Sequence, residues 1–430
     1  MKRTAAENAP HRVEARRLAA IIFLQMLPAT LLVPAIRPLF ATVHNGNEAA
    51  MHAFMALNML GGILAAPWAG RLADRIQSPR RVLATLTAAD ALLLLLVAAP
   101  LPTGLVLLLR VLEGAAHVSA ATLLLAEAAA LRRVLGDGRV MGLAGAAIMF
   151  AIALGSAFGA VAVKVDPRAP FVLGSALAAF VSVLAMARCL PTTRRGERLS
   201  PPASPAPGLL RALAFPLAAA FVERFTIGCI VVTFALFAHR AHGLSDSAVG
   251  TLFTLLVFPF ALLTYPMGRL SDRVPRSALL AAGSALYGTC LALLGRVPAA
   301  GLPWVMGLAG CACAMVFAPT LCYAATLAGS EARGRAMSLV NAAGCLGMLL
   351  GPAAAGIVSA MARANGDPVA GYRAVFHFAG LSVWAWLLMA GPWLACRLRD
   401  ERAALHPAAQ PFPASAGASR LGVLTSEPGS

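Results

Sequence analysis

Apolar residues recur along this 430-residue chain in stretches that are long enough to cross a lipid bilayer. A transmembrane helix needs about 20 predominantly apolar residues. The pattern predicts twelve such helices, at residues 18–38, 51–69, 82–100, 103–128, 140–163 and 169–188, and then at 209–237, 247–267, 277–295, 302–325, 336–360 and 374–396. The fold class expected is therefore an all-α membrane protein with two sets of six spans.

The two sets of spans carry repeated sequences, which indicate an internal duplication. The hexapeptide GRLADR at 70–75 returns as GRLSDR at 268–273, each time between the second and third spans of a set. Residues 137–159 also align without gaps to residues 333–355, at nearly the same offset. These segments predict two homologous six-helix halves, and such repeats place a solute site at their interface near the bilayer midplane.

Charged and turn-forming residues divide the chain into five parts. The segment between the halves is rich in Pro, Ser and Arg, and the final stretch in Pro, Ala, Ser and Gly, which is typical of disorder. We expect a cytoplasmic N-terminal segment at 1–17, six-helix halves at 18–188 and 209–397, a cytoplasmic linker at 189–208, and a disordered cytoplasmic tail at 398–430.

Composition excludes a soluble globular fold. Hydrophobic residues make up 59% of the chain and charged residues 12%, against roughly 25% charged in soluble domains. The net charge of +17 does not predict a nucleic-acid partner, because 26 of the 35 Lys and Arg residues lie on the side of the two termini. By the positive-inside rule both termini are cytoplasmic. Arg far outnumbers Lys, which favours a GC-rich bacterial genome and the bacterial inner membrane.

The repeated loop resembles the signature loop of the major facilitator superfamily, in which an Asp and basic residues follow a glycine after the second helix. The chain departs from the signature at Gln77 and Ser78, where the family usually has Gly. The resemblance implies the major facilitator fold, alternating access, and a charge latch in which Asp meets an Arg or a helix N-terminus. The latch residues expected are Gly70, Asp74, Arg75, Gly268, Asp272 and Arg273. A generic basic loop is the alternative.

The fifth span resembles the glycine-rich signature of the drug:proton antiporters of that family. The chain has Gly155-Ser156 and Gly159-Ala160 where the signature has Gly-Pro and paired glycines, whereas Gly351-Pro352 in the eleventh span keeps the Gly-Pro. The resemblance favours an exporter. Small residues also allow close helix packing in any bundle, so helix packing is the alternative for Gly155, Gly159, Gly351 and Pro352.

Ionisable residues within spans are the functional candidates, because each is costly to insert unless it is paired or hydrated. Arg110, Glu113 and His117 in the fourth span are spaced three and four apart and lie on one stripe of a helix. The pattern Arg110-x-x-Glu113-Gly114 resembles the family's fourth-helix motif, which is associated with proton coupling. Glu113 would release and take up a proton as its contact with Arg110 breaks and forms. A static ion pair is the alternative.

Other polar residues in spans are candidates for coupling or for the substrate cavity. Glu223 and Arg224 in the seventh span would face Glu113 or Arg110 across the cavity, by resemblance to the family. A carboxylate in the cavity favours cationic substrates and an Arg favours anions, and the sequence leaves both open. Asp90 in the third span is either a structural hydrogen-bonding group or a second proton site. The cavity residues expected are His117, Arg224, Gln25, Thr30 and Tyr323.

No soluble catalytic motif occurs in the chain, which has no Walker A loop, no Gly-x-Ser-x-Gly and no His-Glu-x-x-His. We therefore expect no enzyme, no cofactor, no metal and no nucleic-acid partner. The function expected is proton-coupled export of small organic molecules by a monomer. The alternatives are a proton-coupled uptake symporter and a non-transporting membrane sensor or scaffold.

Overall fold

A computed structural model describes residues 9–44, 48–75, 79–135, 137–187, 208–329, 332–363 and 367–405, and nearly all of them are helical. The described part contains twelve helices that are long and apolar enough to span a membrane, which confirms the predicted fold class. The helices are α1 (Ala9–Leu31), α2 (Ile36–Leu39), α3 (Glu48–Arg75), α4 (Pro79–Ala98), α5 (Thr103–Leu135), α6 (Asp137–Ala162), α7 (Ala169–Met186), α8 (Leu209–His242), α9 (Asp246–Leu270), α10 (Arg276–Leu293), α11 (Leu302–Leu327), α12 (Arg333–Ala362) and α13 (Pro368–Leu405).

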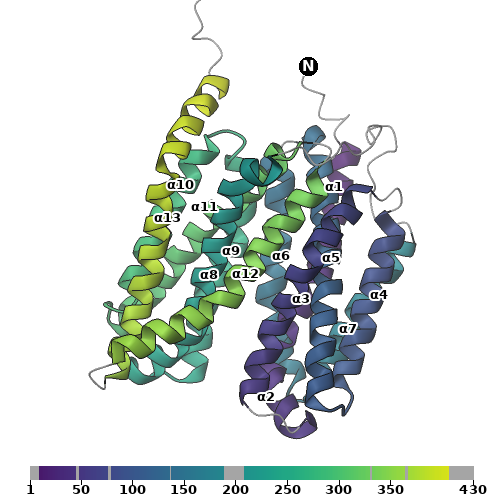
Figure 1. The fold of residues 1–430 in the computed structure, drawn as a ribbon, viewed down its shortest axis with the longest axis vertical. Coiled ribbons are helices and arrows are strands. Elements are labelled where there is room, and N and C mark those ends of the chain that lie inside the picture. Colours follow the sequence, from purple (N-terminus) through teal and green to yellow (C-terminus); the bar gives the residue numbers. More distant parts are fainter. Residues whose placement is uncertain are drawn as a thin grey trace, which may run out of the picture.

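The helices form two bundles that lie side by side (Figure 1). We call α1–α7 the N-half and α8–α13 the C-half. Helix α1 begins and α13 ends at the same end of the molecule, the upper end in Figure 1, which we call the termini side. The opposite end is the far side. Toward the far side the two bundles diverge in Figure 1.

The first and last spans differ from the predicted ones at their ends. Helix α1 begins at Ala9, within the predicted N-terminal segment, and ends at Leu31, where a 3₁₀ turn at Val33–Ala35 follows. Pro34 lies in that turn, and a proline removes a backbone donor that a continuing helix would need. Helix α13 continues through the predicted boundary at residue 397 to Leu405. The linker and most of the predicted tail lie outside the described residues.

Glu401 forms hydrogen bonds to α10 and α11. These bonds stabilise the part of α13 that extends beyond the predicted end of the last half at residue 397. The Glu401 carboxylate accepts hydrogen bonds from the backbone N–H and the hydroxyl of Ser277, at 3.1 and 2.8 Å, in the first turn of α10. It also accepts a hydrogen bond from the hydroxyl of Tyr323 on α11. A carboxylate at a helix N-terminus satisfies unpaired backbone donors and interacts favourably with the helix dipole.

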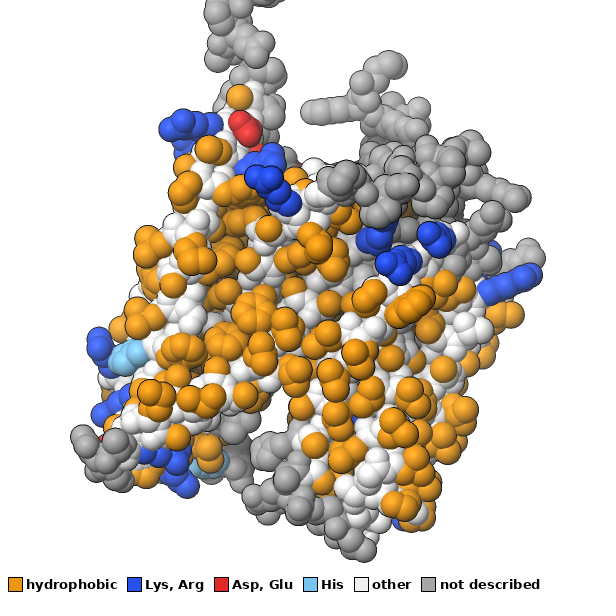
Figure 2. Space-filling model, viewed as in Figure 1, with side chains coloured by type: hydrophobic (Ala, Val, Ile, Leu, Met, Phe, Trp, Pro, Cys, Tyr) orange, Lys and Arg blue, Asp and Glu red, His pale blue; other side chains and the backbone are white. Residues whose placement is uncertain are grey.

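The outer surface of the bundle is apolar between its two ends. Figure 2 shows hydrophobic side chains over the middle of the visible face, with Lys and Arg gathered toward the termini side and the far side. Large apolar side chains of the spans are strongly exposed, among them Trp68, Leu388 and Met389. Lipid solvates such a surface, whereas water would not.

Equivalent glycines bring equivalent helices together in the two halves. Gly155 and Gly159 of α6 lie against the backbone of α1, and Gly347 and Gly351 of α12 lie against the backbone of α8. Any side chain at these positions would collide with the facing helix, so only glycine allows this approach. Gly155 and Gly351 are matched by the sequence repeat, so the duplication also appears in how the helices pack.

The two halves meet on the termini side. At Gly142 of α6, an added Cβ would lie 2.9 Å from the Cα of Gly268 on α9, and at Gly70 of α3 it would lie 2.8 Å from the Cα of Arg335 on α12. The hydroxyl of Ser338 on α12 donates a hydrogen bond to a carbonyl of α3. We call these α3–α12 and α6–α9 contacts the seam.

Candidate functional site

The fourth-span stripe lies within the N-half, and its residues Arg110 and Glu113 contact α3. Arg110 and Glu113 are one turn apart on α5, and their side chains form a buried ion pair. Oε2 of Glu113 also accepts a hydrogen bond from the Asn58 amide on α3 at 2.7 Å. The guanidinium group of Arg110 stacks on the Phe54 ring, with Cζ 4.6 Å from the ring centroid. The pair therefore links α5 to α3.

A second buried pair lies one turn further along α5. Nδ1 of His117 is 3.0 Å from Oδ2 of Asp90 on α4, and the Gln25 amide on α1 donates to the same oxygen at 3.3 Å. An ionised Asp90 accepts both contacts when Nδ1 carries a proton. In that tautomer Nε2 is the basic nitrogen of His117, and it has no hydrogen-bond partner within the described ranges.

The two pairs form one network, which we call the N-half cluster and which consists of Gln25, Asn58, Asp90, Arg110, Glu113 and His117. Asp90, Glu113 and His117 each offer a ligand atom within 4.8 Å of the others. Buried atoms of the cluster still lack partners among the described residues, namely Oε1 of Gln25, Oδ1 of Asp90 and Nε of Arg110. Because these donors and acceptors are unpaired, the hydrogen bonds of the cluster can change when one carboxylate or the imidazole gains or loses a proton.

The same three ligand atoms have the spacing of a metal site, but their surroundings do not favour a metal. A divalent ion needs free carboxylate oxygens. Oε2 of Glu113 already accepts from both Arg110 and Asn58. The guanidinium charge would also repel a second cation. Proton exchange suits this donor set better than metal binding.

In the C-half, the two adjacent charges have only partly the same neighbours. Glu223 is 4% exposed, interacts electrostatically with Tyr287 on α10 and Cys313 on α11, and has an unpaired Oε1 within the described ranges. Arg224 is half-buried and stacks on Phe317 of α11, with Cζ 5.3 Å from the ring centroid. Neighbouring residues of a helix point about 100° apart, which explains the divergence.

Glu223 and Arg224 form no hydrogen bond or ion pair with Glu113 or Arg110 among the described residues. Glu113 and Arg110 contact each other and α3 inside the N-half, whereas Glu223 is buried and interacts with C-half residues. The expected arrangement across the cavity stays a prediction.

Two predicted cavity residues have structural contacts. The hydroxyl of Thr30 donates to the carbonyl of Ala151 at 3.4 Å and lies beside Gly155, at the tight α1–α6 contact. Tyr323 is 4% exposed and bonded to Glu401 in the core of the C-half. The sequence could not reveal this contact, because Glu401 lies beyond the predicted end of the last helix.

Asp272, one of the predicted latch residues, makes a contact across the seam. The Asp272 carboxylate accepts a hydrogen bond from the backbone N–H of Arg139 at 3.2 Å, in the first turn of α6, and lies 3.8 Å from the Arg276 guanidinium. A C-half carboxylate thus caps an N-half helix across the seam. Gly70 and Gly268 lie within the seam, and Arg75 and Arg273 are exposed. The Asp74 side chain lies outside the described residues.

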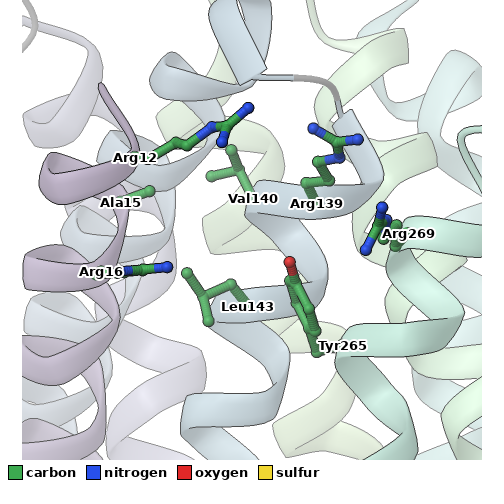
Figure 3. Close-up of a pocket in the computed structure, with 8 residues that line it drawn as sticks. All are labelled: Arg12, Ala15, Arg16, Arg139, Val140, Leu143, Tyr265 and Arg269. Atoms are coloured by element: carbon green, nitrogen blue, oxygen red, sulfur yellow. The ribbon is translucent and has the colours of Figure 1, made fainter. Parts of the chain in front are cut away.

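Beside the Asp272 contact, the seam opens into a basic pocket of about 260 Å³. Figure 3 shows side chains from three helices around it, and its lining consists of Arg12, Ala15 and Arg16 of α1, Arg139, Val140 and Leu143 of α6, and Tyr265 and Arg269 of α9. Its position on the termini side agrees with the positive-inside pattern. The pocket is therefore explained by topology and is separate from the N-half cluster.

Two members of the site were missed from the sequence. Asn58 and Phe54 of α3 contact Glu113 and Arg110, and neither belongs to a recognised motif. The available signal was a single amide in an otherwise apolar span, since polar groups in membrane helices tend to bond across helices.

Comparisons with known proteins agree with this architecture. The family model of the Major Facilitator Superfamily matches residues 18–238 and 216–428. The human organic anion transporter MFSD10 (TETRAN) superposes with a TM-score of 0.70 at 16% identity, over 88% of this chain and 99% of that one. The proton:xylose symporter XylE superposes with a TM-score of 0.69 at 14% identity, over 89% and 96%. No curated protein matches the sequence significantly. The chain belongs to the major facilitator superfamily.

Proposed function

We propose that this transporter couples the movement of small organic molecules to a proton gradient, and that it exports them from the cytoplasm. The observation that carries the proposal is the N-half cluster. Its two carboxylates and one imidazole are buried at membrane depth and connect four helices of the N-half. A group that was only structural would not need so many ionisable partners, which are costly in a membrane.

In the proposed cycle, Glu113 and the His117–Asp90 pair hold the coupling proton. Protonation of Glu113 weakens its charge-assisted bonds to Arg110 and Asn58, and so loosens the contact between α5 and α3. Helix α3 forms part of the seam with α12. A change in the cluster can thus bias the opening of the termini side, which the positive-inside pattern assigns to the cytoplasm.

The direction of transport rests on the resemblance of the fifth span to exporters. The glycines that carry this resemblance also pack α6 against α1. They therefore support export less directly than the N-half cluster supports proton coupling. An uptake symporter would carry protons with its substrate, and an exporter would carry them against it. A non-transporting sensor would move no protons at all.

The test is proton flux in proteoliposomes that contain purified protein and an internal pH dye. Cationic, neutral and anionic aromatic compounds are added in turn to vesicles with an acidic interior. Under the proposal, particular compounds dissipate the gradient as they exchange for protons, and the signal requires Glu113. Compound-driven proton movement in the same direction as the substrate would overturn export and favour symport. Silence across the panel in folded protein would contradict proton coupling.

A further inference from the structure

Arg224 differs from the other arginine at membrane depth. Arg110 is 3% exposed and paired with Glu113. Arg224 is half-buried, and its guanidinium stacks on Phe317. It forms no hydrogen bond or close ion pair among the described residues, and the neighbouring Glu223 interacts with it only through longer-range electrostatics. A cation at membrane depth is costly to maintain, and one without a direct hydrogen-bond partner can bind a ligand.

Small residues of α12 make room for the stem of Arg224. A Cβ added at Gly344 would lie 3.2 Å from Cγ of Arg224, and one added at Gly347 would lie 3.2 Å from its Cβ. A larger residue at either position would push the side chain aside. The aliphatic part of the Arg224 side chain therefore packs against α12, and the residue as a whole stays partly exposed.

The neighbours of Arg224 lie where the two halves meet. Phe317, under the guanidinium group, packs close to Gly145 of α6 in the N-half, where an added Cβ would lie 3.1 Å from the Phe317 ring. Cys345, which follows Gly344 and interacts with Arg224, lies against Gly62 of α3, also in the N-half. Arg224 is thus positioned between the halves near the middle of α8. The repeat predicts the solute site at this depth.

One aromatic ring contacts the cation, and two more lie close to it in the sequence of α8. Phe221 and Phe225 stack on each other along α8, with ring centroids 5.6 Å apart, on either side of Arg224 in sequence. Phe317 provides a third ring. Glu223 is buried and interacts electrostatically with Arg224, which disfavours it as an anchor for a cationic ligand. These features fit one anionic group on an aromatic or apolar body.

We propose that Arg224 binds the anionic group of the transported molecule, and that the substrates are small aromatic organic anions. This inference rests on the proposed transport function and names its substrate class. Guanidinium binds carboxylate through paired, charge-assisted hydrogen bonds. The Phe317 ring of α11 contacts the apolar body.

The test is equilibrium binding of radiolabelled naphthoate to purified protein without any proton gradient. Naphthamide and naphthylmethylamine compete with it, since they keep the ring system and change only the charge. Wild-type protein should prefer naphthoate to the amide by about tenfold or more, which is the usual effect of a hydrogen bond to a charged group. Arg224→Gln should lose that preference, and Arg224→Lys should keep part of it.

Arg296→Gln is the matched control, because it removes an exposed arginine at the far-side end of the C-half and should leave the preference unchanged. Preference for the amine, no saturable naphthoate binding, or an unchanged preference in folded Arg224→Gln would overturn the inference. The comparison of the three ligands on wild-type protein tests the charge preference even if Arg224→Gln does not fold. Naphthoate binding without proton flux would contradict the coupling proposal alone, and flux driven only by amines would contradict this inference alone.

Discussion

The two halves share a fold but treat their membrane-depth charges differently. In the N-half, Arg110 and Glu113 are buried together, and His117 is paired with Asp90. In the C-half, Arg224 lies half-buried between the halves without a hydrogen bond or close ion pair among the described residues, and Glu223 interacts with it only through longer-range electrostatics. The duplication has kept the glycine contacts and has not kept the polar residues. Helix packing needs the same residues in both halves, whereas coupling and recognition need different ones.

The strongest test of this contrast is Glu113→Gln. The amide keeps the shape of the side chain and removes its exchangeable proton, so we expect gradient-driven transport to fall to background. Glu223→Gln is the matched change in the C-half and should cause a smaller loss. Transport rates in proteoliposomes with an imposed pH gradient measure both. Equal losses in the two variants would abolish the proposed division between the halves.

Asp90→Asn tests whether the second pair belongs to the coupling network. An amide at this position cannot accept from both His117 and Gln25 as strongly as a carboxylate. We expect proton-driven transport to fall about tenfold, as one charged hydrogen bond is lost, with substrate binding retained. Binding that falls in parallel with transport would instead indicate a role for Asp90 in general structure.

Gly155→Val and Gly351→Val test the shared feature of the halves. Each valine would collide with the backbone of α1 or α8, and overpacking of this kind costs about 1–3 kcal/mol. We expect both variants to unfold at lower temperature, by similar amounts, in a thermal assay of detergent-purified protein. A Cβ added at Gly356 would meet no atom within 4 Å, so Gly356→Val is the control variant. A large difference between the two variants would argue against equivalent packing.

Asp272→Asn tests the contact that joins the halves. The carboxylate interacts with the first turn of α6, and removal of its charge weakens a helix-terminal interaction that is worth about 0.3–1 kcal/mol. We expect turnover to change by about two- to fivefold, with little change in naphthoate binding, because the contact is remote from Arg224. A selective loss of binding would contradict this role for the seam.

Much of the fold follows from local sequence. The length of the apolar stretches predicts the spans, and the repeated loops predict the halves. Spacing along one helix also brings Arg110, Glu113 and His117 together, because three- and four-residue steps share one helix face. These features depend on one segment at a time, so a single sequence contains them.

Contacts between helices could not be predicted in the same way. Asp90 lies opposite His117 only because α4 packs on α5 at one particular rotation, and Tyr323 is bonded to Glu401 only because α13 continues to Leu405. Nothing in the sequence of one helix fixes its rotation against another. For the same reason, the divergent directions of Glu223 and Arg224 follow from helix geometry, but their partners do not.

The most direct test of the division between the halves compares substrate exchange with gradient-driven transport in the same proteoliposomes. Exchange of labelled naphthoate across a membrane without a pH gradient needs binding and alternating access but no net proton movement. We predict that Glu113→Gln keeps exchange and loses the response to a pH gradient, whereas Arg224→Gln loses both. A Glu113→Gln variant that still responds to the gradient would contradict the account.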